Sequence, residues 1–330
     1  MDVLLLGGTK FLGKHIAETA LRRGHRVTLF HRGLTNPGLF PDAEHITGDR
    51  DGGLDHLKGG RWDAVIDTSG YVPRVVRQSA RQLAELADHY TFISSVSVYA
   101  DFSVLDIAED APLLALEDPA DENVAAHYGA LKARCEDEVR AAFGERALVI
   151  RPGLIVGPDD PTDRFTYWPW RLAQGGDVLV PGSPGRVIQF IDVRDLAEWT
   201  LRMAEAKANG TYNATQPAGM ATMGDLVQAC RHIGAAASNP IWAEEAFLHK
   251  HGAAEWTELP LWVSEKMNWP GFMAVNVKRA VEAGLTFRPL SDTTADTLDW
   301  CRRLRPEGGW KAGLDAEKER HLLRQLYGGK

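Results

Sequence analysis

The chain has 330 residues, of which 44% are hydrophobic and 25% charged, a composition typical of a compact globular protein and not of a disordered one. Its formal net charge of −8 argues against a nucleic-acid partner, because attraction to phosphate backbones requires a basic surface. The amino terminus has neither the basic residues nor the long apolar stretch of a secretory signal, and no segment is long enough to cross a bilayer. We therefore expect a cytoplasmic protein with no membrane partner.

The first half of the chain alternates short apolar runs with helical patterns. Strands are predicted at 3–6, 27–30, 64–67, 90–94 and 148–151, with helices at 12–23, at 75–87 and before residue 148. Strands alternating with helices imply crossover connections. The predicted fold class is therefore α/β, with a doubly wound parallel sheet covered by helices on both faces.

A change in composition after Gly153 predicts a second, smaller region. Prolines and glycines become more frequent, and nine of the ten tryptophans follow residue 160. We assign 1–160 to the sheet domain and expect 187–215 to return to it, through strands at 187–191 and 211–214. Residues 161–186 and 216–330 then form a smaller C-terminal substrate lobe. Trp168, Trp170 and Arg171 either line a pocket there or belong to its core.

A glycine-rich turn joins the first predicted strand to the first helix. It comprises Gly7, Gly8, Thr9, Lys10, Phe11, Leu12 and Gly13. Glycines allow a tight turn and a close approach of the backbone to a pyrophosphate, and the helix N-terminus attracts the phosphates. The strand before the turn and the helix after it favour a dinucleotide cofactor over a plain connecting turn.

The next strand ends at His31 and Arg32, where an acidic residue would favour NAD. A guanidinium can hold a 2′-phosphate with two hydrogen bonds, so NADP is predicted, with NAD as the alternative. Asp49 and Arg50 are assigned to the loop beside the adenine. After the third strand, Thr68 and Ser69 approach the cofactor and Tyr71 borders the nicotinamide, unless this segment is an ordinary loop. Tyr128 and Lys132 are also predicted to contact the cofactor.

A tyrosine and a lysine four residues apart open a predicted helix. Tyr128 and Lys132 then share one helix face. A nearby ammonium is expected to lower the pKa of the phenol, so that Tyr128 can exchange a proton with a substrate hydroxyl. Ser95, at the end of the fourth strand, is expected to orient that substrate. Ser95, Tyr128 and Lys132 are the predicted catalytic residues.

In the order of these motifs, roughly residues 1–215 resemble the extended short-chain dehydrogenase/reductases, the group that contains the NAD-dependent epimerase/dehydratases. Segments 151–158 and 190–197 resemble later motifs of that family. The turn at 7–13 with 30–33 also resembles an isoflavone-reductase-like subgroup. The resemblance implies a Rossmann-type sheet, a small C-terminal substrate lobe, a homodimer, and small-molecule substrates such as nucleotide sugars.

Two departures from the family pattern narrow the expected activity. Lys10 stands where relatives usually carry a third glycine, which leaves the exact pose of the cofactor open. Val96 and Ser97 follow Ser95 where sugar dehydratases carry Asp-Glu, so a dehydratase is not expected. A reductase or an epimerase acting on a secondary alcohol or ketone is predicted, and the sequence does not separate the two.

A non-catalytic protein on the same fold is the alternative, either a nucleotide sensor or an RNA binder. Plant chloroplast stem-loop RNA-binding proteins share related features, but their Tyr and Lys positions are degraded. Tyr128 and Lys132 are intact here, which favours an enzyme. No metal is expected, because the three cysteines are isolated and His249 and His251 lack further ligands at suitable spacing.

Overall fold

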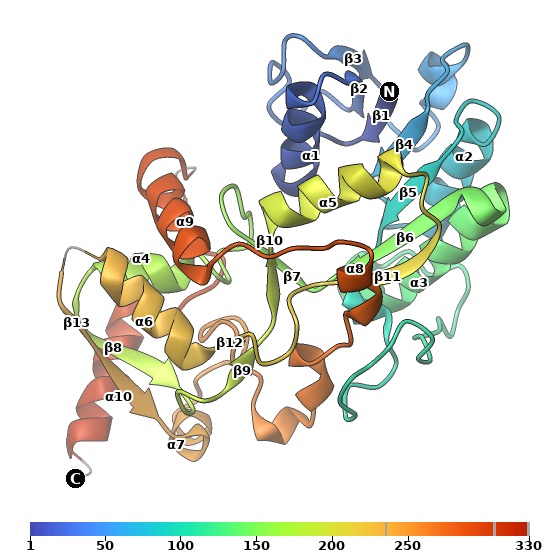
Figure 1. Ribbon diagram of the computed structural model, residues 1–330. Coiled ribbons are helices and arrows are strands. Elements are labelled where there is room, and N and C mark those ends of the chain that lie inside the picture. Colours follow the sequence, from blue (N-terminus) through green and yellow to red (C-terminus); the bar gives the residue numbers. More distant parts are fainter. Residues whose placement is uncertain (235, 306–307, 329–330) are drawn as a thin grey trace.

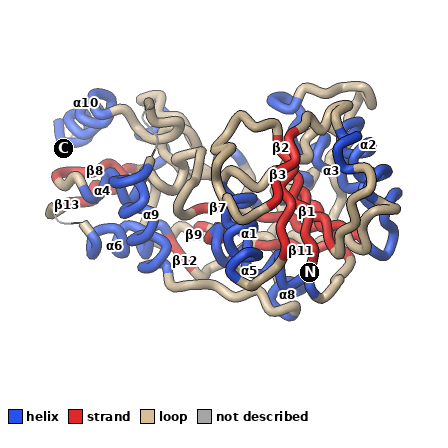
Figure 2. Tube along the Cα trace, turned by 90° about the horizontal axis from the view of Figure 1, so that it is seen from above, coloured by secondary structure: helices blue, strands red, loops and turns tan. Residues whose placement is uncertain are grey.

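The computed structural model describes residues 1–234, 236–305 and 308–328. Its centre is a parallel seven-stranded sheet in the order β11-β6-β5-β4-β1-β2-β3 (Figures 1 and 2). The strands are β1 (Asp2–Leu6), β2 (Arg26–His31), β3 (Glu44–Thr47), β4 (Ala64–Asp67), β5 (Tyr90–Ile93), β6 (Ala147–Pro152) and β11 (Gly210–Ala214). The predicted parallel α/β sheet is confirmed.

Four helices cover the two faces of this sheet. Helices α1 (Phe11–Arg22) and α5 (Val193–Glu205) pack together over one face, and α2 (Pro73–Leu83) and α3 (Val124–Phe143) over the other. Alternate residues of each strand enter the two cores: Leu5 belongs to the first core, and Leu4 and Leu6 belong to the second. Both faces are apolar because helices bury them, which is why the strands read as continuous hydrophobic runs.

The strand order reverses between β1 and β4. From β1 the chain builds outward through β2 and β3, and it then returns to β4 on the other side of β1. The loops that follow β1 and β4 therefore diverge at the carboxyl edge of the sheet. Open α/β sheets bind ligands in the crevice at such a switch point.

The second lobe lies beside the carboxyl edge of the sheet (Figure 2). Its core is formed mainly by α4 (Tyr167–Ala173), α6 (Met223–Ile233) and the parallel strand pair β8 (Gly176–Pro181) and β13 (Ser238–Ala243), with contributions from α7 (Glu245–Lys250) and α10 (Ala316–Gly328). Helix α9 (Leu290–Leu304) packs against α4 and α6. None of the helices in the described ranges has the length and apolar character needed to cross a membrane.

Two segments differ from the predicted division of the chain. Residues 187–191 do not return to the central sheet: β9 (Val187–Ile188) pairs with β12 (Ala221–Thr222), and β10 (Phe190–Asp192) pairs with β7 (Leu154–Val156). Only β11 does return. Conversely, α8 (Lys278–Glu282) lies against β11, and its Ala280 is part of the first domain's core.

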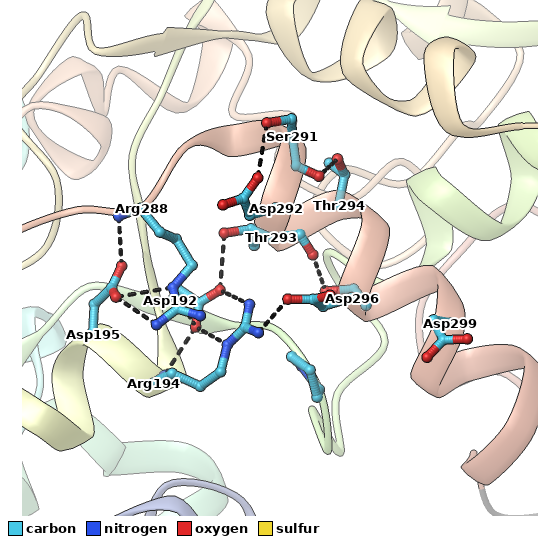
Figure 3. A network of polar contacts seen from close by, with 12 residues as sticks. Asp192, Arg194, Asp195, Arg288, Ser291, Asp292, Thr293, Thr294, Asp296 and Asp299 are labelled. Atoms are coloured by element: carbon cyan, nitrogen blue, oxygen red, sulfur yellow. Dashed lines mark hydrogen bonds and ion pairs between the residues drawn. The ribbon is translucent and has the colours of Figure 1, made fainter.

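A buried carboxylate links α5 to α9 (Figure 3). Asp192 accepts hydrogen bonds from the Arg194 guanidinium and from the Thr293 hydroxyl of α9, the latter at 2.8 Å. Arg288, in the segment before α9, pairs with Asp195 at 2.7 Å and lies 3.6 Å from Asp192. The network holds the second lobe against the first domain.

Candidate active site

One cavity of about 830 Å³ occupies the switch point of the sheet. The predicted residues that line it are Gly7, Gly8, Thr9, Lys10, Phe11, Leu12, Gly13, His31, Arg32, Asp49, Arg50, Thr68, Ser69, Ser95, Tyr128 and Lys132. Residues predicted from distant parts of the sequence are thus brought together.

At its glycine positions the turn has no room for a side chain. Gly7 and Gly8 have φ angles of +113° and +95°, and a Cβ on Gly8 would lie 2.6 Å from the Leu29 side chain. A Cβ on Gly13 would lie 2.8 Å from the Gly8 backbone nitrogen. The backbone therefore forms an open cradle at the start of α1, of the kind that admits a pyrophosphate.

The N-terminus of α1 is also open to an anion. Lys10 occupies the N-cap position, its side chain makes no capping hydrogen bond, and the first turn contains no acidic residue. The first N–H groups and the positive end of the helix dipole consequently face the cradle. The exposed ammonium of Lys10 adds positive charge at the glycine position from which this chain departs.

Two histidines fix the end of the cavity at the turn after β2. His31 Nδ1 accepts a hydrogen bond from the Gly33 N–H, and His31 Nε2 lies 2.9 Å from His45 Nδ1. Burial, and then the neighbouring His45, lower the pKa of His31. His31 therefore holds the turn after β2 as a neutral ring, and the exposed Arg32 is the cation on that turn.

Arg50 lines the cavity, but its charge is used elsewhere. Its two terminal nitrogens bind the Asp67 carboxylate at 2.8 Å each, and one of them also donates to Ser79 at 2.6 Å. Asp67 is fully buried and also accepts from the Tyr90 hydroxyl. The guanidinium is therefore not free to hold a phosphate, so the predicted contact of Arg50 with the cofactor is not supported by its geometry.

Lys132 is buried beside the carboxyl ends of β4 and β5. Its amine donates to the Gly70 carbonyl at 2.7 Å and to the Ile93 carbonyl at 2.6 Å. Burial lowers the pKa of Lys132 to about 8. The carbonyls fix the amine in place, and the low polarity around it makes its charge easy to give up.

Tyr128 follows a kink in α3. His127 has non-helical backbone angles (φ −125°, ψ 31°), and the regular helix runs on from Tyr128. Burial raises the pKa of Tyr128 to about 12, and the nearby Tyr71 adds to the effect, whereas Ser95 opposes it. The predicted lowering of this pKa by Lys132 is wrong for the protein by itself, because burial has the largest effect and raises it.

Ser95 ends the strand–loop connection after β5. Its hydroxyl accepts a hydrogen bond from the Ser97 N–H at 3.1 Å and lines the cavity near Tyr128. The preceding Ser94 instead donates to the buried Glu136 at 2.6 Å. Ser95 is therefore the serine of this pair that is available to a ligand.

The wall contributed by the second lobe was not predicted. Pro161, Thr162, Arg164, Trp256 and Phe272 line the cavity. The guanidinium of Arg164 lies 5.3 Å from the centre of the Trp256 ring, and its Nε donates to Thr162. Trp256 and Phe272 lie in irregular segments without periodicity, so only the Thr162–Arg164 segment, next to a recognisable motif, offered a sequence signal.

Three aspartates precede Arg164 in the sequence, and none of them forms an ion pair with it. Asp159 pairs with Lys14 of α1 at 2.7 Å, and Asp163 pairs with Arg305 at 2.9 Å. Asp160 accepts from the backbone and hydroxyl of Thr162. Within the described residues, no carboxylate lies within ion-pair distance of Arg164, which leaves a cation in the cavity wall.

Trp168, Trp170 and Arg171 lie outside this wall, so the core alternative is confirmed for Trp168. Its ring is fully buried and donates to the Pro260 carbonyl at 3.0 Å. Trp170 packs against Trp310 with the rings tilted by 44° and their centres 4.5 Å apart, and Arg171 pairs with Glu319. These side chains stabilise the second lobe.

A parallel doubly wound sheet with a glycine cradle at its switch point defines a dinucleotide-binding fold of Rossmann type. Residues 3–215 match the NAD dependent epimerase/dehydratase family. The match covers more than half of the chain, and the chain belongs to this family.

Two curated proteins illustrate the relationship. The chain is 27% identical over 254 residues to the chloroplast stem-loop binding protein of 41 kDa b of Arabidopsis thaliana, covering 70% of this chain and 63% of that protein. It therefore spans less than two thirds of that relative. It is 25% identical over 259 residues to the epimerase family protein SDR39U1 of Bos taurus, covering 73% of this chain and 82% of the relative.

Solved enzyme structures share the fold. The Bordetella bronchiseptica enzyme WbmH in complex with NAD+ superposes with a TM-score of 0.69 at 18% identity, over 92% of this chain and 98% of that one. The UDP-glucuronic acid 4-epimerase of Bacillus cereus in complex with NAD gives 0.68 at 15% identity, over 94% and 100%. At these identities the likeness establishes the fold alone.

Proposed function

We propose that this chain is an NAD(P)-dependent oxidoreductase or epimerase of the extended short-chain dehydrogenase/reductase type. The observation that carries the proposal is the single cavity that joins the glycine cradle to Ser95, Tyr128 and Lys132. The substrate class is a secondary alcohol or ketone. Nucleotide sugars are candidates, since a fold neighbour is a UDP-glucuronic acid 4-epimerase.

The cofactor we propose is NADP, with NAD as the alternative. The cradle residues and the uncapped N-terminus of α1 would hold the pyrophosphate. Arg32 is exposed at the end of β2, and no acidic residue occupies that position to bind two ribose hydroxyls. The NAD-containing neighbours keep NAD as the alternative.

A bound nicotinamide would supply the site with a hydride donor or acceptor. Tyr128 is the proposed acid and base: with a pKa of about 12 its hydroxyl is protonated at neutral pH and ready to donate to a carbonyl oxygen. Ser95 would orient that oxygen. Lys132, held by two carbonyls, would place its remaining N–H toward the cofactor ribose and the phenol.

Arg164 is the proposed contact for a negatively charged part of the substrate. A half-buried guanidinium without a carboxylate partner gains more from an anion than one exposed to bulk water. Trp256, beneath it, offers a flat surface for a ring. A charged substrate with a planar or ring portion fits this wall.

Replacing Tyr128 tests the proposal. The Tyr128→Phe variant keeps the ring and loses the proton, and we expect a fall of about 10²- to 10⁴-fold in cofactor-dependent turnover of carbonyl substrates, including UDP-sugars. Tyr327→Phe, far away on α10, is the matched control and should leave turnover unchanged. Equal turnover by the wild type and Tyr128→Phe would exclude this catalytic role.

The same samples separate epimerase from reductase. Native mass measurement of the purified protein with NAD and NADP added separately would report cofactor occupancy and subunit number. Tightly retained NAD indicates an epimerase, and exchangeable NADPH indicates a reductase. A homodimer and a cytoplasmic location remain predictions.

A non-catalytic nucleotide or RNA binder is the second candidate, because one relative is a stem-loop binding protein. It predicts that the chain binds an RNA stem-loop and that Tyr128→Phe does not change this binding. The net charge of −8 weighs against it. Lack of stem-loop binding in low salt would remove the RNA binder, and cofactor-dependent turnover that is lost in Tyr128→Phe would remove the non-catalytic nucleotide sensor.

A further inference from the structure

The amine of Lys132 lies between two aromatic rings. Its nitrogen is 4.3 Å from the centre of the Phe92 ring and 5.2 Å from the centre of the Tyr71 ring. Two of its three protons go to the carbonyls of Gly70 and Ile93. Lys132 is 3% exposed, whereas Tyr71 is 45% exposed and lines the cavity, so Tyr71 forms the outer layer over the amine.

The segment that carries Tyr71 is fixed on the amine by Gly70. A Cβ on Gly70 would lie 2.5 Å from the Phe92 ring and 2.9 Å from Val76, so only glycine fits. This close packing brings the Gly70 carbonyl to 2.7 Å from the amine of Lys132. Backbone and ring of consecutive residues therefore act on the same nitrogen.

Tyr71 also faces the proposed acid and base. Its ring centre is 6.4 Å from that of Tyr128, and each of the two rings lines the cavity. The three side chains Tyr71, Tyr128 and Lys132 thus form one cluster, although the sequence pattern pointed to only two of them as catalytic.

We propose that Tyr71 is a positioning residue for Lys132. The Tyr71 ring covers the Lys132 amine against Phe92 and keeps water from it at the cavity wall shared with Tyr128. The role in catalysis rests on the function proposed above. The covering itself is a property of the protein without any ligand.

The effect of the Tyr71 ring on the pKa of Lys132 depends on two opposing contributions: the ring removes water from the ammonium, and its face attracts the ammonium. Burial is the largest effect on the pKa of Lys132, which falls to about 8 despite the opposing charges near it. The titratable groups around the amine are Tyr71 and Tyr128 in the cavity wall, Cys135 and Glu136 of its own helix, Asp67 at the end of β4, and Arg50 after β3. A ring face attracts the ammonium, but by less than lost hydration costs. Removing the ring should therefore raise this pKa toward its ordinary value.

The test is a titration of the Lys132 amine in the full-length protein by NMR of ¹³Cε-labelled lysine, from pH 6 to 11. The Lys132 signal is assigned by its absence in Lys132→Met. In Tyr71→Ala we expect a pKa at least about one unit above the wild-type value, because water reaches the amine. Tyr71→Phe keeps the ring and should titrate like the wild type.

Tyr327→Ala is the matched control, since Tyr327 is 46% exposed and lies on α10 in the second lobe. It should leave the Lys132 titration unchanged. An unchanged pKa in Tyr71→Ala would overturn the proposal, and so would an equal shift in Tyr71→Phe, which would assign the effect to the hydroxyl. The titration needs no cofactor, so it is decided even if the protein proves not to bind one.

With activity in hand, a second readout separates positioning from general damage. The basic limb of the kcat profile should move to higher pH in Tyr71→Ala and return to the wild-type position in Tyr71→Phe. A fall in kcat with no shift of the limb would contradict the proposed role.

Discussion

Two arginines that line the cavity, Arg32 and Arg50, carry the same charge but differ in what they can bind. Arg50 is held by Asp67, 17 residues further along the chain, whereas Arg32 is exposed on the turn after β2. The sequence predicted that both would meet the cofactor. It could not separate them, because the pairing of Arg50 arises only when β3 and β4 are assembled on the two sides of the sheet's centre.

We therefore predict that Arg32→Ala weakens NADP binding about 10- to 100-fold and leaves NAD binding nearly unchanged, since a charge-assisted contact to the 2′-phosphate contributes about 1.5–3 kcal/mol. Calorimetric titration with both cofactors measures this. Arg26→Ala, at the other end of β2 and paired with Asp2, is the control. Equal losses for NAD and NADP in Arg32→Ala would show that Arg32 does not select the phosphate.

The segment between β7 and α4 is anchored at two points and presents a positive charge to the cavity. Asp159 ties it to α1 and Asp163 ties it to Arg305, which leaves Arg164 facing the cavity. Between them, Asp160 is almost fully buried, and one of its carboxylate oxygens has no hydrogen-bond partner among the described residues. Burial raises the pKa of Asp160 to about 6.

Replacing Asp160 by asparagine should stabilise the protein at neutral pH. The folded-state pKa of about 6 lies above the unfolded value of 3.8, so the carboxylate lowers the unfolding free energy as pH rises through this range, by up to about 3 kcal/mol above pH 6. Asp160→Asn keeps an acceptor for Thr162 and loses the charge. Urea unfolding should show a higher unfolding free energy for Asp160→Asn than for the wild type at pH 7 but not at pH 4. Asp177→Asn, at the surface, should show no gain at either pH. A gain of equal size at pH 4 would contradict the account.

Helices and strands of the first domain could be predicted because their signals are local. The apolar run 3–6 and the glycine turn after it specify β1 and its connection without reference to the rest of the chain. Strand β3 (Glu44–Thr47) was missed because it lies at the sheet edge and its four residues are at least partly exposed. Strands β8 and β13 are separated by about 60 residues in the sequence, so no local pattern predicted their pairing.

At the scale of the whole molecule, the cavity exists because two lobes meet along one edge of the sheet. The first domain supplies the cradle and the Tyr128–Lys132 pair, and the second supplies Arg164 and Trp256. Asp192 helps to fix this arrangement through Arg194 and through Thr293 of α9 (Figure 3). The sequence motif around Asp192 was recognisable. Thr293, the partner of Asp192 on α9, lies about 100 residues later and could not be recognised from the sequence.

We predict that Asp192→Asn lowers the unfolding free energy by about 1.5–3 kcal/mol, because it removes the buried carboxylate that accepts hydrogen bonds from Arg194 and Thr293, while Arg194 keeps its contact with Asp296. Asp296→Asn is the matched control: it removes only a half-exposed partner of Arg194 and should cost less than about 1 kcal/mol. Denaturant unfolding of both variants gives the comparison. Similar losses in the two variants would mean that the buried carboxylate does not hold the lobes together.

The most direct measurement is a calorimetric titration of the wild type and a Gly8→Val variant with NADPH and NADH. A side chain at Gly8 would lie within 2.6 Å of Leu29 and distort the cradle, while the Tyr128–Lys132 cluster is untouched. We expect one binding site per chain in the wild type, with NADPH bound more tightly than NADH, and loss of binding in the variant. Binding of neither dinucleotide to the wild type, or unchanged binding to Gly8→Val, would contradict it.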